Sequence, residues 1–582
     1  MTANGSITAA YGNMMTVRFE ESVRQNEVAY LRLADGSRLK SEVIRIRGNQ
    51  CNLQVFEDTQ GIKVGDPVEF TGELLSVELG PGLLRQIYDG LQNPLPELAS
   101  SAGLFLKRGL YFDGLDRSPR WDFTPLSRQG DRVAAGHVLG WVPEGKFQHM
   151  IFVPFSFIGQ GTITRMASPG LYTVDEVVCE LEGDDGQRHQ LNMIQRWPIK
   201  TPLRHYEERL LPIEPLVTGC RIIDSFFPVA KGGTACIPGP FGSGKTVLQQ
   251  LISRYADADI IIVAACGERA GEVVETLREF PHLIDPYTGK TLMERTVIIC
   301  NTSSMPVAAR EASIYTAVTI GEYYRQMGLD VLLLADSTSR WAQALREMSG
   351  RLEEIPGEEA FPAYLQSRIA EFYERAGAVR LADGKQGSVT VIGTVSPAGG
   401  NFEEPVTQGT LAVVGSFLGL TWERSNARRF PAIDPLISWS KYLDQMDKRL
   451  NEIQPDWVSL IKKAQRLLFE GSEIKKRMDV VGEEGTALNE FVLYLKAEFL
   501  DSVYLQQNAF DEVDAYNAMD RQARTFLKIL DILDKEFTIP DKDQARDVFF
   551  RLTALFKNWN ASEWLSEAFL KIEAEIDEVL KG

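Results

Sequence analysis

The eight residues at positions 239–246 constrain the fold of this chain more than any other segment. They read Gly239-Pro-Phe-Gly-Ser-Gly-Lys-Thr246 and fit the spacing G-x-x-x-x-G-K-[S/T]. Glycines at this spacing let consecutive backbone N–H groups turn inward around an anion, while the lysine reaches outer phosphates and the threonine hydroxyl ligates magnesium. The sequence therefore predicts a phosphate-binding loop made by Gly239, Pro240, Phe241, Gly242, Ser243, Gly244, Lys245 and Thr246.

A loop of this kind connects an apolar strand to a helix, and the flanking sequence predicts both. Residues 234–237 form a short apolar run that ends at Pro238, and apolar residues recur at helical spacing from Val247 to Ile252. An ordinary glycine-rich turn is the alternative interpretation of the same eight residues. The strand before the loop and the helix after it favour the phosphate site.

Further apolar runs surround the loop in sequence. They lie at 260–266, 296–300, 329–335 and 389–395, and each is continuous rather than alternating. Strands that are buried on both faces of a parallel sheet have this pattern. Together with residues 234–237 they predict at least five parallel strands with helices between them, which is an α/β nucleotide-binding domain.

The remaining sequence predicts three more domains. Residues 1–75 hold repeated short strands separated by turns, which is typical of a small β-barrel or sandwich. Residues 110–190 are rich in glycine and proline around short apolar runs, so we expect an inserted β-rich module there. Residues 441–582 have helical periodicity and few glycines. The α/β domain then comprises residues 76–109 and 191–440.

Composition excludes several classes of protein. A chain of 582 residues is too long for one hydrophobic core. Its net charge of −18 repels a phosphodiester backbone, so we expect no nucleic acid partner. The six cysteines are scattered without a C-x-x-C pair, which disfavours a structural zinc site or a disulfide framework. No run reaches the ~18 apolar residues of a membrane span, so we expect a cytoplasmic protein that meets a membrane only through partners.

Two further segments supply the acidic groups that nucleotide hydrolysis needs. The apolar run that ends at Asp336 predicts a carboxylate in the metal shell, although a helix N-cap is the alternative. The segment after residue 266 holds Glu268, Arg269 and Glu272 at the carboxyl edge of the predicted sheet, where α/β proteins bind ligands. We expect Glu268 to polarise water, Arg269 to contact phosphate and Glu272 to hold a metal-bound water. Acidic residues also favour helix starts, which is the alternative for this segment.

These motifs together resemble the catalytic A subunit of the V-type and A-type rotary ATPases, in a bacterial branch. The resemblance covers essentially the whole chain and rests on seven segments: Gly239–Thr246, Cys266–Arg269, Asn301–Tyr315, Ala335–Arg340, Arg346–Arg351, Pro405–Gln408 and Gln506–Phe510. It implies an N-terminal β-barrel, an inserted bulge domain, a RecA-like nucleotide-binding domain and a C-terminal helical domain. Ala270 and Gly271 stand where the family usually has glycine and asparagine, whereas Glu272 is retained.

The resemblance also implies a mechanism and an assembly. Three copies alternate with three B subunits around a central shaft, peripheral stalks complete the complex, and an ion-translocating sector lies in the membrane. Mg²⁺ with ATP or ADP is the cofactor, and catalysis rests on Glu268, Lys245 and Arg269. Thr246 ligates the metal directly, while Asp336 and Glu272 do so through water. Phe430 and Phe510 match the two aromatic side chains that hold adenine.

Other members of the same superfamily fit the sequence less well. An F-type beta subunit or an export-apparatus ATPase lacks the bulge, so its phosphate loop lies much nearer the N-terminus than residue 239. A B-type subunit has a degenerate phosphate loop, whereas this loop is intact. A nucleotide-binding subunit without turnover stays open as an alternative, and Glu268 is the residue that discriminates between the two functions.

Overall fold

We describe a computed structural model of the chain, in which residues 4–102, 108–303 and 305–581 are described. The chain divides into two compact units. The first comprises residues 1–210, 259–284 and 288–389, and the second comprises residues 211–258, 285–287 and 390–582. No helix in the described ranges has both the length and the apolar character needed to cross a bilayer.

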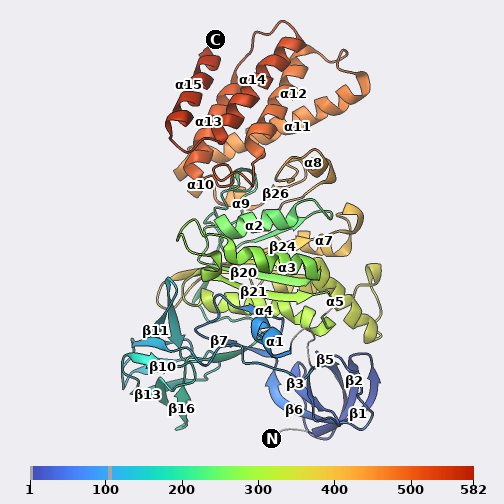
Figure 1. Cartoon of the computed structure of the whole chain (residues 1–582), viewed down its shortest axis with the longest axis vertical. Helices are drawn as coiled ribbons and strands as arrows, with labels where there is room; N and C mark the ends of the chain where they lie inside the picture. The colour runs from blue at the N-terminus through green and yellow to red at the C-terminus, as the bar shows by residue number, and fades with distance from the viewer. Residues whose placement is uncertain (1–3, 103–107, 304, 582) are drawn as a thin grey trace. The chain divides into compact units, whose positions relative to one another are not determined.

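The first unit begins with a closed six-stranded barrel (Figure 1). Its antiparallel strands follow the order β1-β2-β5-β4-β3-β6. Alternate side chains such as Val17, Leu53 and Phe70 point inward and are fully buried, so each strand contributes one face to the barrel core. The six strands are β1 Asn4–Tyr11, β2 Met14–Phe19, β3 Glu27–Arg32, β4 Arg38–Arg47, β5 Gln50–Val55 and β6 Pro67–Leu74.

An inserted β module follows, and a short two-stranded sheet joins the chain before it to the chain after it. In this sheet β7 (Ser76–Leu79) pairs antiparallel with β17 (Gln195–Pro198). Two four-stranded sheets with separate hydrophobic cores make up the module. Their strands are β9 Trp121–Pro125, β10 Arg132–Ala134, β11 Val138–Glu144, β12 Phe147–Phe152, β13 Gln160–Met166, β14 Gly170–Tyr172, β15 Cys179–Gly183 and β16 Arg188–Leu191.

The module is anchored to the α/β part of the first unit through a buried histidine. His149 shares a hydrogen bond of 2.6 Å between its Nδ1 and Glu144, and one of 2.8 Å between its Nε2 and the Tyr323 hydroxyl. Tyr323 belongs to α4 (Val307–Arg325), which is buried along its whole length. The contact therefore ties the inserted strands to the central helix of the α/β layer.

The α/β part of the first unit contains four parallel strands in the order β8-β21-β20-β22. The strands are β8 Ile87–Tyr88, β20 Ile260–Glu268, β21 Thr296–Thr302 and β22 Asp330–Asp336. The last three confirm the strands predicted from the apolar runs at 260–266, 296–300 and 329–335. Beside them lie α1 Leu95–Ala102, α3 Ala270–Glu279, α4, α5 Thr338–Arg351 and α6 Leu365–Tyr373. β23 (Gly377–Arg380) pairs antiparallel with both β18 (Glu208–Leu210) and the start of β24 (Gln386–Val395).

The second unit holds the strand that leads into the phosphate loop. β19 (Thr234–Pro238) runs parallel to the end of β24 and to β25 (Ser416–Phe417), and β26 (Trp439–Ser440) pairs antiparallel with β25. The loop opens directly into α2 (Lys245–Tyr255). The short helices α7 (Pro405–Leu411) and α8 (Trp422–Asn426) follow.

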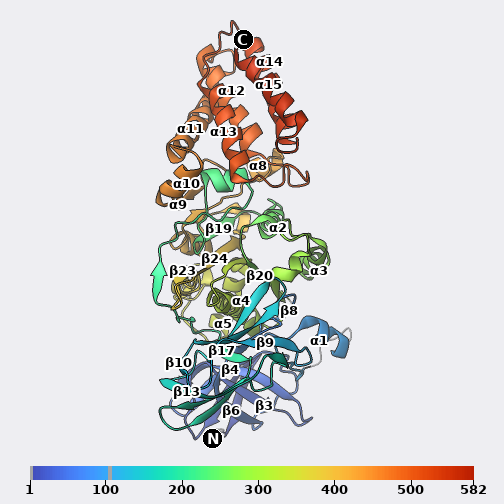
Figure 2. The same cartoon turned by 90° about the vertical axis from the view of Figure 1, so that its left-hand side faces the viewer.

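The remainder of the second unit is helical, as its periodicity predicts (Figure 2). α11 contacts α12, α12 contacts α14, and α14 contacts α15, so the helices form one bundle. Aromatic side chains such as Phe499, Phe556 and Trp559 fill its interior. The helices are α9 Tyr442–Gln445, α10 Asp447–Ile453, α11 Trp457–Val481, α12 Leu488–Leu500, α13 Met519–Asp534, α14 Lys542–Asn560 and α15 Glu567–Lys581.

Candidate functional site

The phosphate loop has the backbone that its glycines predict. Gly242 and Gly244 have φ angles of 79° and 90°, a region that side chains disfavour. A Cβ on Gly239 would lie 2.7 Å from the Cβ of Leu420, so no side chain fits at the start of the loop. Residues 239–246 therefore form a tight turn between β19 and α2, with the helix N-terminus facing the loop, as anion binding requires.

Lys245 lies across this loop. Its Nζ donates to the carbonyl oxygens of Gly239 at 2.7 Å and Pro240 at 2.9 Å. Ser243 is buried, and its hydroxyl donates to the Pro240 carbonyl at 2.8 Å, which closes the turn from within. Thr246 is exposed in the first turn of α2. The Lys245 ammonium thus lies at the loop and the Thr246 hydroxyl follows it at the start of α2.

The structure places Phe430 beside the phosphate loop. Its ring lies 3.7 Å from the position of a Cβ on Gly244, and the side chain is partly exposed. Two arginines hold the segment before it: Arg424 binds both carboxylate oxygens of Asp501 at 2.8 and 3.1 Å, and Arg429 pairs with Asp501 and with Glu498. Phe430 is therefore held next to the loop, and its side chain remains partly exposed.

Phe510 lies in the segment that follows the π-helical turn Asp501–Leu505. Its side chain is 88% exposed, whereas Gln507 three residues earlier is buried. The backbone N–H of Gln507 donates to the carbonyl oxygen of Phe430 at 2.8 Å, so the segment that carries Phe510 is joined to the segment that carries Phe430. An exposed aromatic ring on an anchored loop is suited to stacking on a base.

The first unit brings three of the predicted acidic residues together. Glu268 ends β20 and Asp336 ends β22, and the two strands are adjacent and parallel with Ala265 opposite Asp336. Glu272 lies in the first turn of α3 and shares a hydrogen bond with Glu268. Parallel strands deliver their carboxyl ends to one edge, which is why residues distant in sequence meet here.

The neighbours of Glu268 in this cluster raise its pKa. Burial, the negative charge of Asp336 and the hydrogen bond and charge of Glu272 raise its pKa from 4.5 to about 8, while Arg340 acts in the opposite direction. A carboxyl with a pKa near the working pH can take up and release a proton, as a general base must. The arrangement is therefore chemically suited to activating water.

Sequence reasoning did not single out two arginines beside this cluster. A Cβ on Gly267 would lie 3.2 Å from the Cδ of Arg310 and 3.2 Å from the Cβ of Arg340. Arg310 also pairs with Glu347 at 3.1 Å. Asp336 ends β22 and Arg340 lies in the first turn of α5, only four residues later, and this closeness was a signal available in the sequence. Arg269, by contrast, is exposed directly after the end of β20.

The residues predicted to bind magnesium carry oxygen donors of a suitable type. Mg²⁺ prefers hard oxygen ligands and keeps several waters, and it binds through one or two protein oxygens together with phosphate oxygens. The hydroxyl of Thr246 and the carboxylates of Asp336 and Glu272 are donors of this type. Their roles, like those of the other predicted site residues, stay predictions.

Comparison with known proteins adds four family matches along the chain. Residues 7–72 match the β-barrel domain of the ATP synthase alpha/beta family, and residues 112–200 match the alpha/beta subunit barrel-sandwich domain. Residues 219–440 match the nucleotide-binding domain of the same family. Residues 448–546 match the C-terminal domain of V and A type ATP synthases. Fold and phosphate loop thus define a nucleotide-binding subunit of the ATP synthase alpha/beta class.

Named relatives identify the family to which the chain belongs within this class. The chain is 58% identical over 578 residues to the V-type ATP synthase alpha chain 1 of Treponema pallidum (strain Nichols), with 99% of this chain and 96% of the relative covered. It is 57% identical over 579 residues to the V-type ATP synthase alpha chain of Protochlamydia amoebophila (strain UWE25), with 100% and 97% covered. The chain belongs to the family of V-type ATP synthase alpha chains, the ATP-hydrolysing or ATP-synthesising class that the resemblance predicts.

Proposed function

We propose that this chain is the catalytic subunit of a rotary complex in which ATP hydrolysis or synthesis with Mg²⁺ is coupled to proton or sodium transport. In the proposed complex three copies alternate with three B subunits, and central and peripheral stalks connect them to a membrane sector. The chain itself would stand on the cytoplasmic side, peripheral to the membrane. Membership in the V-type alpha-chain family supports this assembly.

The proposed chemistry assigns a separate task to each group. Lys245 and backbone N–H groups of the phosphate loop bind the outer phosphates and stabilise the charge that develops on them. Arg269 adds a second cation. Phe430 and Phe510 hold the adenine ring between them. Mg²⁺, held by Thr246 and, through water, by Asp336 and Glu272, neutralises phosphate charge when bound.

Glu268 is proposed to orient the attacking water and to accept its proton, so that the water attacks the γ-phosphorus in line with the leaving oxygen. The single observation that carries this role is the carboxyl cluster at the sheet edge, where Glu268 ends β20 beside the end of β22 at Asp336 and shares a hydrogen bond with Glu272. Burial and these two groups raise the pKa of Glu268. The cluster therefore favours a catalytic chain over a nucleotide-binding chain without turnover.

The isolated chain is expected to hydrolyse ATP poorly. In related NTPases an arginine supplied in trans accelerates hydrolysis by about 10³ to 10⁵, and the family places this arginine on the B subunit. The test is to purify the native complex through this chain and to compare its ATPase rate with that of the chain alone. A lone chain as active as the complex would contradict the shared site, and a complex without ATPase activity would favour the subunit without turnover.

A further inference from the structure

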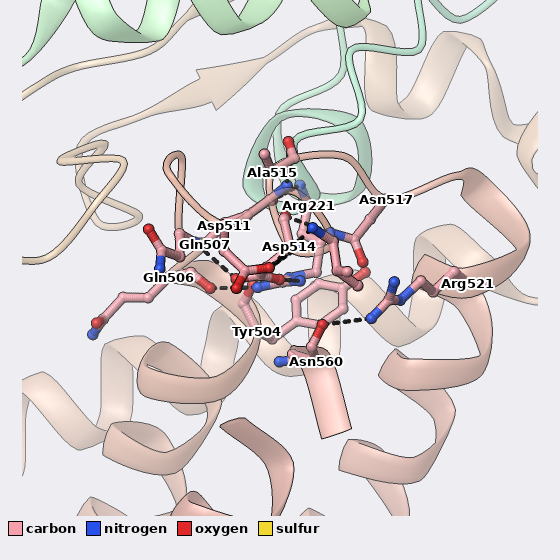
Figure 3. Close-up of polar contacts among 12 residues, drawn as sticks. Arg221, Tyr504, Gln506, Gln507, Asp511, Asp514, Ala515, Asn517, Arg521 and Asn560 are labelled. Atoms are coloured by element: carbon pink, nitrogen blue, oxygen red, sulfur yellow. Dashed lines mark hydrogen bonds and ion pairs between the residues drawn. The ribbon is translucent and has the colours of Figure 1, made fainter. Parts of the chain in front are cut away.

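Arg221 is a fully buried arginine that lies on none of the motifs of the site (Figure 3). It is 1% exposed and directs its guanidinium at the loop of residues 506–517. Its Nε donates to the carbonyl oxygen of Tyr504 at 2.8 Å, one terminal nitrogen donates to Asp514 at 2.5 Å, and the other donates to the carbonyl oxygen of Gln506 at 2.5 Å. The fork of one side chain therefore holds both ends of the loop.

Gln507 completes this connection. The backbone N–H of Arg221 donates to its Oε1 at 2.9 Å, and its Nε2 donates to the carbonyl oxygens of Gly219 at 2.8 Å and Ala515 at 3.1 Å. Its own backbone N–H donates to the carbonyl oxygen of Phe430 at 2.8 Å. The side chain and the backbone of this glutamine thus join the loop, the Arg221 segment and the Phe430 segment.

The tip of the loop lies between these anchors. Asp514, which Arg221 holds, also accepts from the backbone N–H of Asn508 at 2.7 Å. Phe510 follows two residues later, and its backbone N–H donates to the Asn508 side chain at 3.1 Å. Because the Phe510 ring is 88% exposed, packing does little to fix it, and its position depends on the hydrogen bonds that close the loop.

We propose that Arg221 is a positioning residue for the base of the bound nucleotide. It would act through the 506–517 loop, by holding Phe510 at the level of Phe430, which itself lies beside Gly244 of the phosphate loop. The proposal rests on the proposed nucleotide function, and it predicts which part of the nucleotide depends on Arg221. Loss of Arg221 weakens contacts to the base and leaves contacts to the phosphates unchanged.

Arginine is required here because three donors with fixed geometry serve three acceptors on different parts of the loop. Lysine carries the same charge, but it offers one nitrogen and cannot bridge the same acceptors. Asp514→Asn removes the carboxylate from the other side and leaves Arg221 in place. The two substitutions therefore test the same connection from its two ends.

The test measures dissociation constants of the purified full chain for two probes, Mg-ATP and Mg-tripolyphosphate, by titration calorimetry. Arg221→Lys, Asp514→Asn and Phe510→Ala are each expected to weaken ATP binding by about tenfold, since stacking of a base on an aromatic ring is worth about 1–3 kcal/mol. Tripolyphosphate binding is expected to change by less than about twofold in all three, because it has no base. Arg221→Lys added to Phe510→Ala is expected to have no further effect on ATP.

Arg521→Met is the matched control. Arg521 is also a buried arginine, and it donates to the carbonyl oxygen of Asn560 (Figure 3). It donates to the carbonyl oxygen of Ser562 as well, and not to the loop. Its substitution is expected to lower stability without changing the preference for ATP over tripolyphosphate. A loss of ATP preference in this control as large as that in Arg221→Lys would overturn the proposal.

Two further outcomes separate the possible failures. If Arg221→Lys and Asp514→Asn weaken both probes equally, or if their effects add to that of Phe510→Ala, then Arg221 has only a structural role. If either variant fails to fold, the test uses the other variant and measures its hydrogen exchange at residues 506–517. Exchange in that variant as slow as in the wild type would overturn the proposal. A wild-type chain that binds neither probe would refute the nucleotide function itself, and the positioning role with it.

Discussion

Replacement of Glu268 by glutamine is expected to stabilise the chain, and the gain is expected to grow with pH. Because the folded state raises the pKa of Glu268 from 4.5 to about 8, the folded chain retains a proton that the unfolded chain releases between these values. The wild type therefore loses stability as pH rises from about 4.5 to about 8, and the loss is constant above that. Glutamine cannot ionise, so the variant lacks this loss.

The magnitude follows from the same two values. At about 1.4 kcal/mol per pH unit, the interval from 4.5 to about 8 gives an upper bound of about 5 kcal/mol. Glu268 is partly exposed, and water that reaches the carboxyl reduces this to about 2 kcal/mol. The expected gain from Glu268→Gln is therefore near zero at pH 4.5 and about 2 kcal/mol at pH 8.5, or about a thirtyfold change in a local opening equilibrium.

Amide hydrogen exchange in the segment 260–280 measures this opening directly. Protection factors of wild type and variant are compared at several pH values after correction for intrinsic exchange. Glu371→Gln is the control, since Glu371 is an exposed partner of Arg368 on α6 and its loss is expected to produce no such trend. Equal protection of wild type and Glu268→Gln at pH 8.5 would refute the account of the carboxyl cluster.

Three other predictions follow from the site. Gly239→Ala places a methyl group against fixed atoms at the start of the phosphate loop, so its ATP affinity is expected to fall at least about tenfold; Gly350→Ala, which meets no atom within 4 Å, is the control, and equal affinity of the two variants would contradict the prediction. Arg424→Met leaves Asp501 buried with one of its arginines lost, and urea unfolding is expected to show a loss of about 3 kcal/mol, whereas an unchanged midpoint would show that the pair does not anchor the Phe430 segment. The kcat/KM of the complex is expected to fall up to about tenfold per pH unit below about 8 as Glu268 gains a proton, and a flat profile between pH 6 and 8 would exclude it as the base.

Much of the fold follows from local sequence pattern. The short strands predicted within residues 1–75 are present, for example as β2, and the strand predicted at 260–266 extends by two residues to Glu268. Continuous apolar runs identify buried strands because both faces of the strand are covered. The inserted module was predicted only as β-rich, since pairs within its sheets, such as β9 with β14, join strands that are far apart in sequence.

The parts of the candidate site that consecutive residues form could be predicted from the sequence. The parts that tertiary packing brings together could not. The phosphate loop depends on eight consecutive residues, so its glycines and Lys245 could be identified from the sequence alone. The contribution of Arg340 to the environment of Glu268 depends on two different strand ends meeting at one edge. The role of Arg221 could not be predicted from the local sequence, because its partners lie about 290 residues further along the chain.

The central claim is that this chain performs the hydrolytic step and that Glu268 is the residue that activates water. The most direct measurement is single-turnover hydrolysis of Mg-ATP by the complex purified through this chain, with ATP binding determined in the same preparation. The Glu268→Gln complex is expected to bind ATP as the wild type does and to hydrolyse it at least about a hundredfold more slowly. Hydrolysis at the wild-type rate by the Glu268→Gln complex would contradict the account.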